Sequence, residues 1–207
     1  KAECDLCIMK PETCHYHLGT CRENDFAHNV CFQPHIVYLA NSSALKIGIT
    51  RIVNMPTRWL DQGATQALPI MKVGSRRLSG HLETLFGTQI ADKTDWRKLL
   101  KGEAEPLNLI EQRDQIIEEF APKIQSIRDE FSQNLEFNEN LELLENEIPH
   151  EFIYPVEQYP EKIKSLNLDK TPKIRSVLQG IKGQYLILDI GVINIRKYTG
   201  YELILRT

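Results

Sequence analysis

The sequence predicts an α+β protein made of four consecutive segments. All five cysteines lie within the first 31 residues, strand-like and helical apolar patterns alternate from residue 35 to about residue 100, and short glycine-separated strands follow a glutamate-rich stretch. Strands and helices that are partly mixed and partly in separate runs are typical of the α+β class. The predicted segments are a Cys/His segment at 1–34, an α/β core at 35–101, an acidic helical segment at 102–147 and a small antiparallel β module at 148–207.

Length and composition are those of an ordinary globular protein. The 207 residues are 42% hydrophobic and 26% charged, so a core can form without disulfide bonds. No run approaches 18 apolar residues, and the first thirty residues lack the apolar stretch of a signal peptide. We therefore expect a cytoplasmic protein without a membrane-spanning segment.

Charge is distributed unevenly along the chain. Residues 1–45, 46–101, 102–150 and 151–207 carry net charges of −2, +6, −10 and +3, which total the formal −3. The acidic block is most simply explained as the solvated face of helices, whereas the basic block beside it suits a polyanionic ligand. The near-neutral mean charge therefore does not exclude nucleic acid as a partner.

The N-terminal segment concentrates the soft metal ligands of the chain. Two pairs of ligands are each separated by two residues, a spacing that lets both members reach one tetrahedral ion. In a cytosolic protein this clustering favours zinc over disulfide bonds. The candidate ligands are Cys4, Cys7, Cys14, His17, Cys21 and Cys31.

The spacing leaves two groupings open. One takes the first three cysteines together with Cys21 or His17. The other takes Cys14, His17, Cys21 and Cys31, and leaves the first two cysteines as half of a second site. Because protein side chains would supply every ligand, we expect a structural zinc ion; the alternative is a set of free or buried thiols.

The next segment predicts a hairpin followed by alternating elements. Runs of β-branched and aromatic residues at 36–39 and 45–49 flank a polar turn at 41–43, which is typical of two antiparallel strands. A short helix is expected at 56–62 and a third strand at 68–73. A second helix is indicated by an apolar stripe of Leu78, Leu82, Leu85 and Phe86.

These residues resemble the GIY-YIG nuclease superfamily. The resemblance rests on Val37-Tyr38 in one strand, Lys46-Ile47-Gly48 in the next, Arg58 in the following helix and Glu83 in a later helix, and covers about residues 36–90. It implies a GIY-YIG-like core between the Cys/His segment and the acidic helices. The signature is short, so its weight depends on the geometry of these side chains.

A wider resemblance covers most of the chain. The motifs are Cys-x2-Cys, Cys14-His15-Tyr16-His17, 19–23 (GTCRE), 31–35 (CFQPH) and 61–64 (DQGA). Together they resemble an uncharacterised prokaryotic family, domain-of-unknown-function family 2797. This resemblance suggests the family of the chain without implying an activity.

The nuclease resemblance implies a role for each matched residue. Tyr38 would help to activate the attacking water, Arg58 would stabilise the phosphate, and Glu83 would hold one Mg²⁺ or Mn²⁺ ion. Lys46 stands where many members have a second tyrosine, and could lower the pKa of Tyr38 or bind phosphate. No histidine stands in the helix just after Arg58, where many of these nucleases have one, which suggests that catalysis is altered or lost.

Basic residues around this core are the candidate contacts to a nucleic-acid backbone. Arginine and lysine bind phosphate oxygens, and arginine does so with two parallel hydrogen bonds. The candidates are Arg51, Lys72, Arg76 and Arg77.

The acidic segment and the C-terminal segment are predicted to be mainly scaffold. Residues 106–144 have helical composition, and Pro122 is expected to kink the helix or divide it into two. Glycines then separate a series of short strand patterns that suggest a small sheet or barrel. The predicted strands are 152–154, 176–181, 184–190, 192–195 and 201–205.

The basic block and the matched residues predict a nucleic-acid-binding protein, and the GIY-YIG resemblance implies, more specifically, a metal-dependent nuclease. The alternative is a non-catalytic zinc-containing adaptor that binds nucleic acid or another protein through a degenerate core of the same kind. Nothing in the sequence distinguishes DNA from RNA or indicates an oligomeric state.

Overall fold

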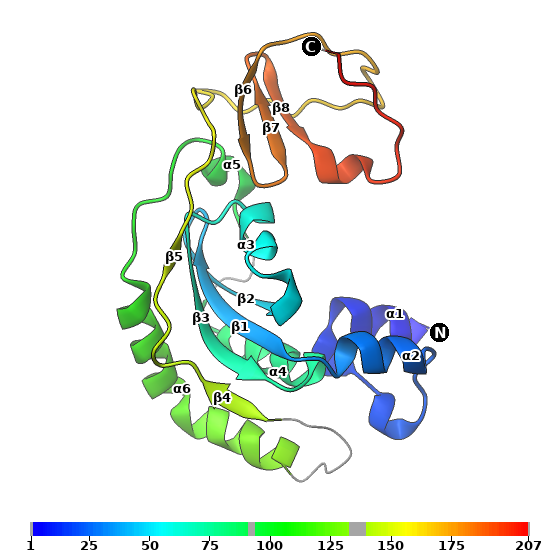
Figure 1. Ribbon diagram of the computed structural model, residues 1–207, viewed down its shortest axis with the longest axis vertical. Coiled ribbons are helices and arrows are strands. Elements are labelled where there is room, and N and C mark those ends of the chain that lie inside the picture. The colour runs from blue at the N-terminus through cyan, green and yellow to red at the C-terminus, as the bar shows by residue number, and fades with distance from the viewer. Residues whose placement is uncertain (1, 91–93, 133–139, 207) are drawn as a thin grey trace.

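The centre of the protein is an antiparallel sheet. The structure, a computed structural model, describes residues 2–90, 94–132 and 140–206 (Figure 1). The strands run in the order β2-β1-β3-β4, and β5 also pairs with β3. These strands are β1 (His35–Asn41), β2 (Leu45–Arg51), β3 (Gln66–Val73), β4 (Leu141–Leu143) and β5 (His150–Glu151). The predicted hairpin is confirmed, and β2 is an edge strand of this sheet.

Two helices cover one face of the sheet and form the main core with it. The helix α4 (Arg76–Phe86) buries its apolar stripe against β1, β2 and β3, and α6 (Leu109–Ser132) packs beside it. Pro122 lies inside α6 without ending it, so of the two alternatives expected for this proline, division into two helices is wrong. The buried Phe120 and Ile124 on either side of Pro122 pack into the same core, and this shared packing outweighs the local cost of the proline.

The short helix α3 (Thr57–Asp61) lies over the opposite face of the sheet. Alternate residues of β1 point to this face, and the ring of Tyr38 packs edge-on against Trp59 with a centroid distance of 5.8 Å. The alternation of β1 therefore assigns Tyr38 to the α3 side and Val37 and Leu39 to the main core.

The N-terminal segment consists of short helical pieces that pack on α4. These pieces are α1 (Ala2–Met9), Pro11–Thr13, Tyr16–Leu18, α2 (Asn24–Phe26) and Ala27–Cys31. Gly80 of α4 permits this packing, because a Cβ atom there would lie 2.7 Å from the Glu12 nitrogen and from Pro11. The segment is thereby fixed at the N-terminal half of α4.

A second sheet of three antiparallel strands forms the C-terminal part. It contains β6 (Leu178–Lys182), β7 (Tyr185–Leu188) and β8 (Gly191–Asn194), and a turn of 3-10 helix at Ile195–Tyr198 follows. The predictions of strands at 152–154 and 201–205 are wrong, since neither segment pairs as a strand there. Residues 141–143, expected to be helical, form β4 because β3 offers them a free edge.

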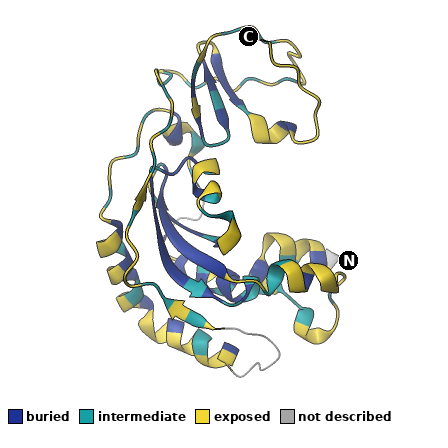
Figure 2. Ribbon diagram, in the orientation of Figure 1, coloured by how far each residue is buried: buried dark blue, intermediate teal, exposed yellow. Residues whose placement is uncertain are grey.

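The molecule curves so that its two ends lie on the same side of the central sheet. The N-terminal segment and the β6–β8 sheet flank α3, and the short helix α5 (Trp96–Leu99) lies next to the second sheet (Figure 1). Burial is densest in β1 and β3, while the outer faces of α1, α2 and α6 are exposed (Figure 2). Within the described ranges, no helix is both long and apolar enough to cross a membrane.

Candidate functional site

A pocket lies along the edge strand β2, and we call it the β2 pocket. Its volume is about 380 Å³, and residues from the N-terminal segment, β1, β2, α3 and α4 line it. The four predicted catalytic residues, which are spread over more than forty positions of the chain, all contribute to this lining. Its charged residues are Lys46, Arg51, Arg58, Arg76 and Glu83, and Tyr38 and His35 also face it. Four permanent cations therefore surround one carboxylate.

Strand pairing places Tyr38 in this pocket. Tyr38 is directly opposite Gly48 in the antiparallel register of β1 and β2. A Cβ atom on Gly48 would lie 2.7 Å from the ring of Tyr38 and from its hydroxyl oxygen, so only glycine leaves room for the ring. The glycine of the Lys46-Ile47-Gly48 motif is therefore required because Tyr38 of the Val37-Tyr38 motif lies directly opposite it in the hairpin.

The hydroxyl group of Tyr38 is held by α3. Its side chain is completely buried, and the Nε2 amide of Gln62 donates a 2.9 Å hydrogen bond to its oxygen. Burial raises the pKa of Tyr38, although the nearby Arg58 guanidinium and the Gln62 hydrogen bond act in the opposite direction. Tyr38 is therefore a neutral phenol at neutral pH, which suits it to donate a hydrogen bond rather than to remove a proton.

Lys46 enters the pocket from β2 with most of its length covered. Only 6% of the residue is exposed, and its Nζ donates a 3.1 Å hydrogen bond to the hydroxyl of Thr94. Lys46 therefore contributes one positive charge to the lining of the β2 pocket. Thr94 was not predicted as part of the site, and no local pattern in the sequence links it to β2.

Glu83 and Arg58 approach the pocket from opposite faces of the sheet. Glu83 lies on α4 and Arg58 on α3, and both are half-buried at the β2 edge. Glu83 is the single carboxylate among the residues that line the pocket. A hard oxygen ligand of this kind fits Mg²⁺ or Mn²⁺, which would need water and substrate oxygens to complete its coordination.

The structure separates the predicted nucleic-acid contacts into two groups. Arg51 and Arg76 line the β2 pocket. Lys72 instead lies 3.7 Å from Glu142 in a β3–β4 ion pair, and the Arg77 guanidinium packs over Phe131 at 4.9 Å. The structure therefore brings Arg51 and Arg76, and not Lys72 or Arg77, to the predicted catalytic residues.

Arg76 also connects the pocket to the N-terminal segment. Its guanidinium donates to the carbonyl oxygen of Cys7 at 3.0 Å and to that of Ile8, both at the end of α1. Because one side chain lines the β2 pocket and holds α1, the folding of the Cys/His segment determines the position of one pocket cation.

His35 is a pocket residue that the sequence reasoning did not select. It is 3% exposed, and its Nδ1 donates a 2.7 Å hydrogen bond to the Gln33 carbonyl oxygen. Burial, with smaller contributions from the positive charges of Arg76 and Arg51, lowers the pKa of His35 to about 4, although the Gln33 hydrogen bond acts in the opposite direction. The predicted hairpin could have indicated His35, because its register places His35 opposite Arg51.

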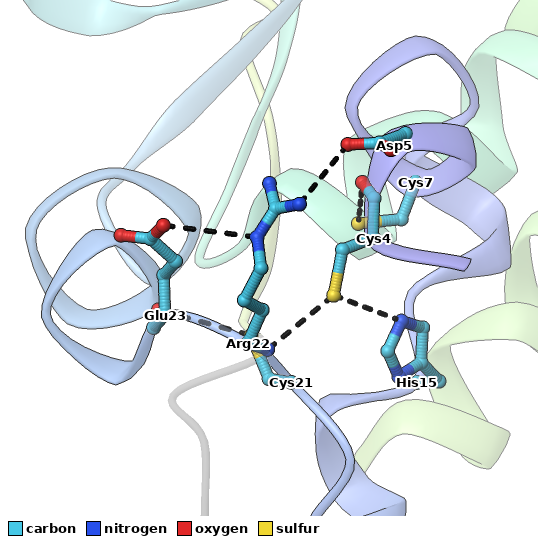
Figure 3. A network of polar contacts seen from close by, with 7 residues as sticks. All are labelled: Cys4, Asp5, Cys7, His15, Cys21, Arg22 and Glu23. Atoms are coloured by element: carbon cyan, nitrogen blue, oxygen red, sulfur yellow. Dashed lines mark hydrogen bonds and ion pairs between the residues drawn. The ribbon is translucent and has the colours of Figure 1, made fainter. Parts of the chain in front are cut away.

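The cysteines of the first segment lie in two adjoining groups, which Cys7 connects by donating a 3.2 Å hydrogen bond from its Sγ atom to the Cys4 carbonyl oxygen (Figure 3). In one, the Sγ atom of Cys4 lies 3.7 Å from the Nε2 atom of His15 and accepts a 3.3 Å hydrogen bond from the backbone of Arg22, beside Cys21 (Figure 3). In the other, a small apolar pocket is lined by Cys7, Cys14, His17 and Cys31.

The second group, which we call the Cys₃His cluster, has the donor set of a zinc site. Three thiols and one imidazole match the Cys₃His type of structural site. All five cysteines are free of disulfide bonds. Among the described residues, however, no three potential ligands are already close enough to one another to hold an ion. The residue types of the Cys₃His cluster fit a zinc site, but its side chains would have to move closer together to coordinate one ion.

Comparison with protein families places this chain. A family model described as "Protein of unknown function (DUF2797)" matches residues 1–203. The chain belongs to the DUF2797 family. No curated protein and no solved structure matches it. In this DUF2797 protein both the β2 pocket and the Cys₃His cluster lie inside the matched region. The description of the family assigns no chemistry to either.

Proposed function

We propose that this DUF2797 protein binds nucleic acid at the β2 pocket and hydrolyses a phosphodiester bond there as a GIY-YIG-type nuclease. One observation carries the proposal: Tyr38, Lys46, Arg58 and Glu83, which come from four different elements, line a single pocket. The excess of cations in the same pocket suits a polyanion.

Each of the four side chains would have a separate role in the hydrolysis of a phosphodiester bond. Water forms a new bond to phosphorus and releases a proton to solvent, the ester P–O bond breaks, and the departing oxygen takes up a proton from solvent. Arg58 and Lys46 stabilise the negative charge that develops on the phosphoryl oxygens. Tyr38 keeps its own proton at the hydroxyl oxygen and orients an oxygen of the substrate or of water with it. Glu83 would hold a divalent ion, which supplies Lewis-acid stabilisation of the phosphate when it is bound.

The burial of Tyr38 supports a second candidate function, a non-catalytic adaptor that binds nucleic acid at the same pocket. A phenol with no exposed surface and a raised pKa is a poor activator of water. In an adaptor of this kind the four cations would bind phosphate. Glu83 would then hold no metal ion and would only offset part of the positive charge of the pocket. The two candidates differ in turnover and not in binding.

A cleavage screen tests the first candidate. Single- and double-stranded DNA and RNA are incubated with Mg²⁺ or Mn²⁺ and the wild-type protein, Glu83→Gln or Arg58→Ala. We expect cleavage by the wild type and a loss of at least about 100-fold in both variants, as for removal of one group that stabilises transition-state charge. Glu142→Gln is the matched control, because Glu142 lies outside the pocket beside Lys72.

Binding is measured separately, without divalent ions, by fluorescence anisotropy of labelled strands. Tight binding by the wild type without cleavage of any substrate would favour the adaptor. Cleavage that Glu83→Gln retains in full would exclude Glu83 as the metal ligand. Absence of both binding and cleavage would reject the shared premise that the β2 pocket is a phosphate site.

We also propose that zinc organises the N-terminal segment through Cys7, Cys14, His17 and Cys31. The four line one pocket, which also contains Arg76, so an ion there would rigidify the end of α1 that Arg76 holds. Small segments of short helical pieces are commonly stabilised in this way. This ligand set differs from both groupings that the spacing left open. It leaves out Cys4, which contacts His15, and Cys21, which donates a hydrogen bond to the Glu23 carbonyl oxygen.

Metal analysis of the purified protein tests the zinc proposal. We expect about one zinc ion per chain in the wild type. Cys14→Ser should lose that zinc, whereas Cys21→Ser, which alters a cysteine outside the Cys₃His cluster, should keep it. Wild-type protein with a small fraction of one zinc per chain, or equal loss in both variants, would contradict the proposed ligand set.

A further inference from the structure

A second groove adjoins the β2 pocket and extends toward the C-terminal sheet. It has a volume of about 730 Å³ and lies between residues 53–61, around α3, and residues 181–196 of the β6–β8 sheet and the turn after it. Asn54 and Arg58 line both this groove and the β2 pocket. We call it the α3 groove; the two spaces meet at Arg58.

The wall formed by the C-terminal sheet is firmly attached to α3. Gly183 sits in the β6–β7 turn with a φ of +57°, and a Cβ atom there would lie 2.9 Å from the Asp61 carbonyl oxygen and from the Gly63 nitrogen. Tyr154 lies in the segment that bridges to β6 through Val156 and Gly180. It donates hydrogen bonds to the carbonyl oxygens of Leu60 and Ala64 at the end of α3. Such close packing fixes the width of the α3 groove.

A buried lysine attaches the same sheet to the segment before α6. Lys182 is completely buried, and its Nζ donates a 2.8 Å hydrogen bond to the carbonyl oxygen of Gly102 and a 3.3 Å hydrogen bond to the Tyr159 hydroxyl. The rings of Trp96 and Tyr185 stack beside this contact at an angle of 10°. These contacts hold the second sheet in place beside the α3 groove, which Arg58 also lines.

The chemistry of the α3 groove matches that of a nucleic-acid strand. Arg58 and the exposed Arg196 supply a cation from each wall, against the single carboxylate of Asp61. Apolar surface lies between them: Val53 is 76% exposed, and Ile181 and Ile195 are also exposed. Arginine binds the phosphates of a strand, and exposed aliphatic side chains offer apolar contact to the faces of unpaired bases, a role that aromatic side chains fill in many single-strand binding sites.

We infer that the nucleic acid bound at the β2 pocket is an extended single strand, which continues past Arg58 through the α3 groove and contacts Arg196. This inference rests on the proposed function. A single strand is the chosen occupant because its unpaired bases can lie on the exposed apolar side chains. The bases of a duplex are stacked inside it and would leave this apolar surface uncovered.

Strand length and one charge reversal test the inference. Anisotropy measures the affinity of wild-type protein, Arg196→Glu and Lys197→Glu for labelled single strands of about three and about twelve nucleotides, without divalent ions. Lys197 is the matched control, since it is an exposed neighbour that does not line the α3 groove. We expect Arg196→Glu to weaken binding of the long strand at least about tenfold and of the short strand less than about twofold.

The other outcomes distinguish the two proposals. Equal effects of Arg196→Glu and Lys197→Glu on the long strand, or wild-type affinity in Arg196→Glu, would overturn the inference and leave phosphate binding at the β2 pocket intact. Tighter binding of a duplex of the same length would overturn the choice of a single strand. Failure of the wild type to bind any strand would overturn the proposed function and this inference together.

Discussion

The pair of Tyr38 and Gly48 shows how a single missing side chain shapes the β2 pocket. The tyrosine ring occupies the volume that a Cβ atom on Gly48 would need, at 2.7 Å. The ring is also fixed on its other side by Trp59 and at its hydroxyl by Gln62. Because the ring cannot move without losing these contacts, a larger residue at position 48 must displace the hairpin or the tyrosine.

Gly48→Ala is predicted to destabilise the protein by about 1–3 kcal/mol, the usual range for overpacking a core. The displaced ring should also weaken the Gln62 hydrogen bond and reduce nucleic-acid affinity at the β2 pocket. Urea unfolding and anisotropy measure the two effects. Gly102→Ala is the control, since a Cβ atom there meets nothing within 4 Å. Equal stability of both variants would refute the steric account.

The burial of His35 leads us to predict that the folded protein loses stability in mild acid. Burial lowers its pKa to about 4 in the folded protein, whereas the unfolded chain has the ordinary value of about 6.5. Between these two values the unfolded state binds the proton more tightly, so folding stability is complete above about pH 6.5 and falls as the pH drops toward 4. The loss attributable to this one residue is about 3 kcal/mol.

Urea unfolding at pH 7 and pH 4.5 measures this dependence. His35→Asn removes the titrating ring and keeps an amide that can donate to the Gln33 carbonyl oxygen. The variant should lose less stability than the wild type between the two pH values. An identical loss in both proteins would assign the acid sensitivity to other groups.

At the scale of elements, the N-terminus of α4 connects the main core to the N-terminal segment. Ser75 is the N-cap of this helix, and its buried Oγ atom accepts a 3.0 Å hydrogen bond from the Leu78 backbone. Arg76, the next residue, holds the end of α1 and lines the β2 pocket. The first turn of α4 thus orients a pocket residue as well as starting the helix.

Ser75→Ala is predicted to cost about 1 kcal/mol of folding stability, because the N-cap acceptor is lost from a buried position. Ser132→Ala is the matched control, since the Ser132 hydroxyl is exposed at the last residue of α6 and donates only to Asp129. Thermal or urea unfolding compares the two variants. Equal effects would show that the cap of α4 contributes nothing specific.

At the scale of the whole molecule, the C-terminal sheet depends on one glycine for its position. Gly183 combines a left-handed backbone conformation with close contact to Asp61 and Gly63 at the end of α3. A side chain there would both strain the β6–β7 turn and push the two parts of the protein apart.

Gly183→Ala is predicted to loosen the second sheet from α3 and to speed proteolysis of residues 157–177, most of which are already exposed in the wild type. Gly19→Ala is the control, since Gly19 has a similar φ of +66° but no atom within 4 Å of a Cβ position. Both variants carry about 1 kcal/mol of backbone strain, and only Gly183→Ala adds the collision with α3. Faster cleavage by trypsin in Gly183→Ala alone is the expected result; equal cleavage rates would assign the effect to strain.

The sequence by itself determined the local elements of this protein. The hairpin, β3 and the apolar stripe of α4 follow from residue periodicity, which is a property of neighbouring residues. Where pairing with a distant segment decides, the local pattern was misleading: residues 201–205 have a strand-like composition without a partner strand, and residues 141–143 became β4 beside β3.

Only the tertiary structure decided which side chains share a site. It brought Tyr38, Arg58 and Glu83 to the β2 pocket, left Lys72 outside it, and placed Cys14 and Cys31 at one small pocket. Sequence motifs supplied the residue types for these sites. Their distances depend on how α3, α4 and the N-terminal segment pack on the sheet, and that packing is the sum of contacts between residues far apart in the chain.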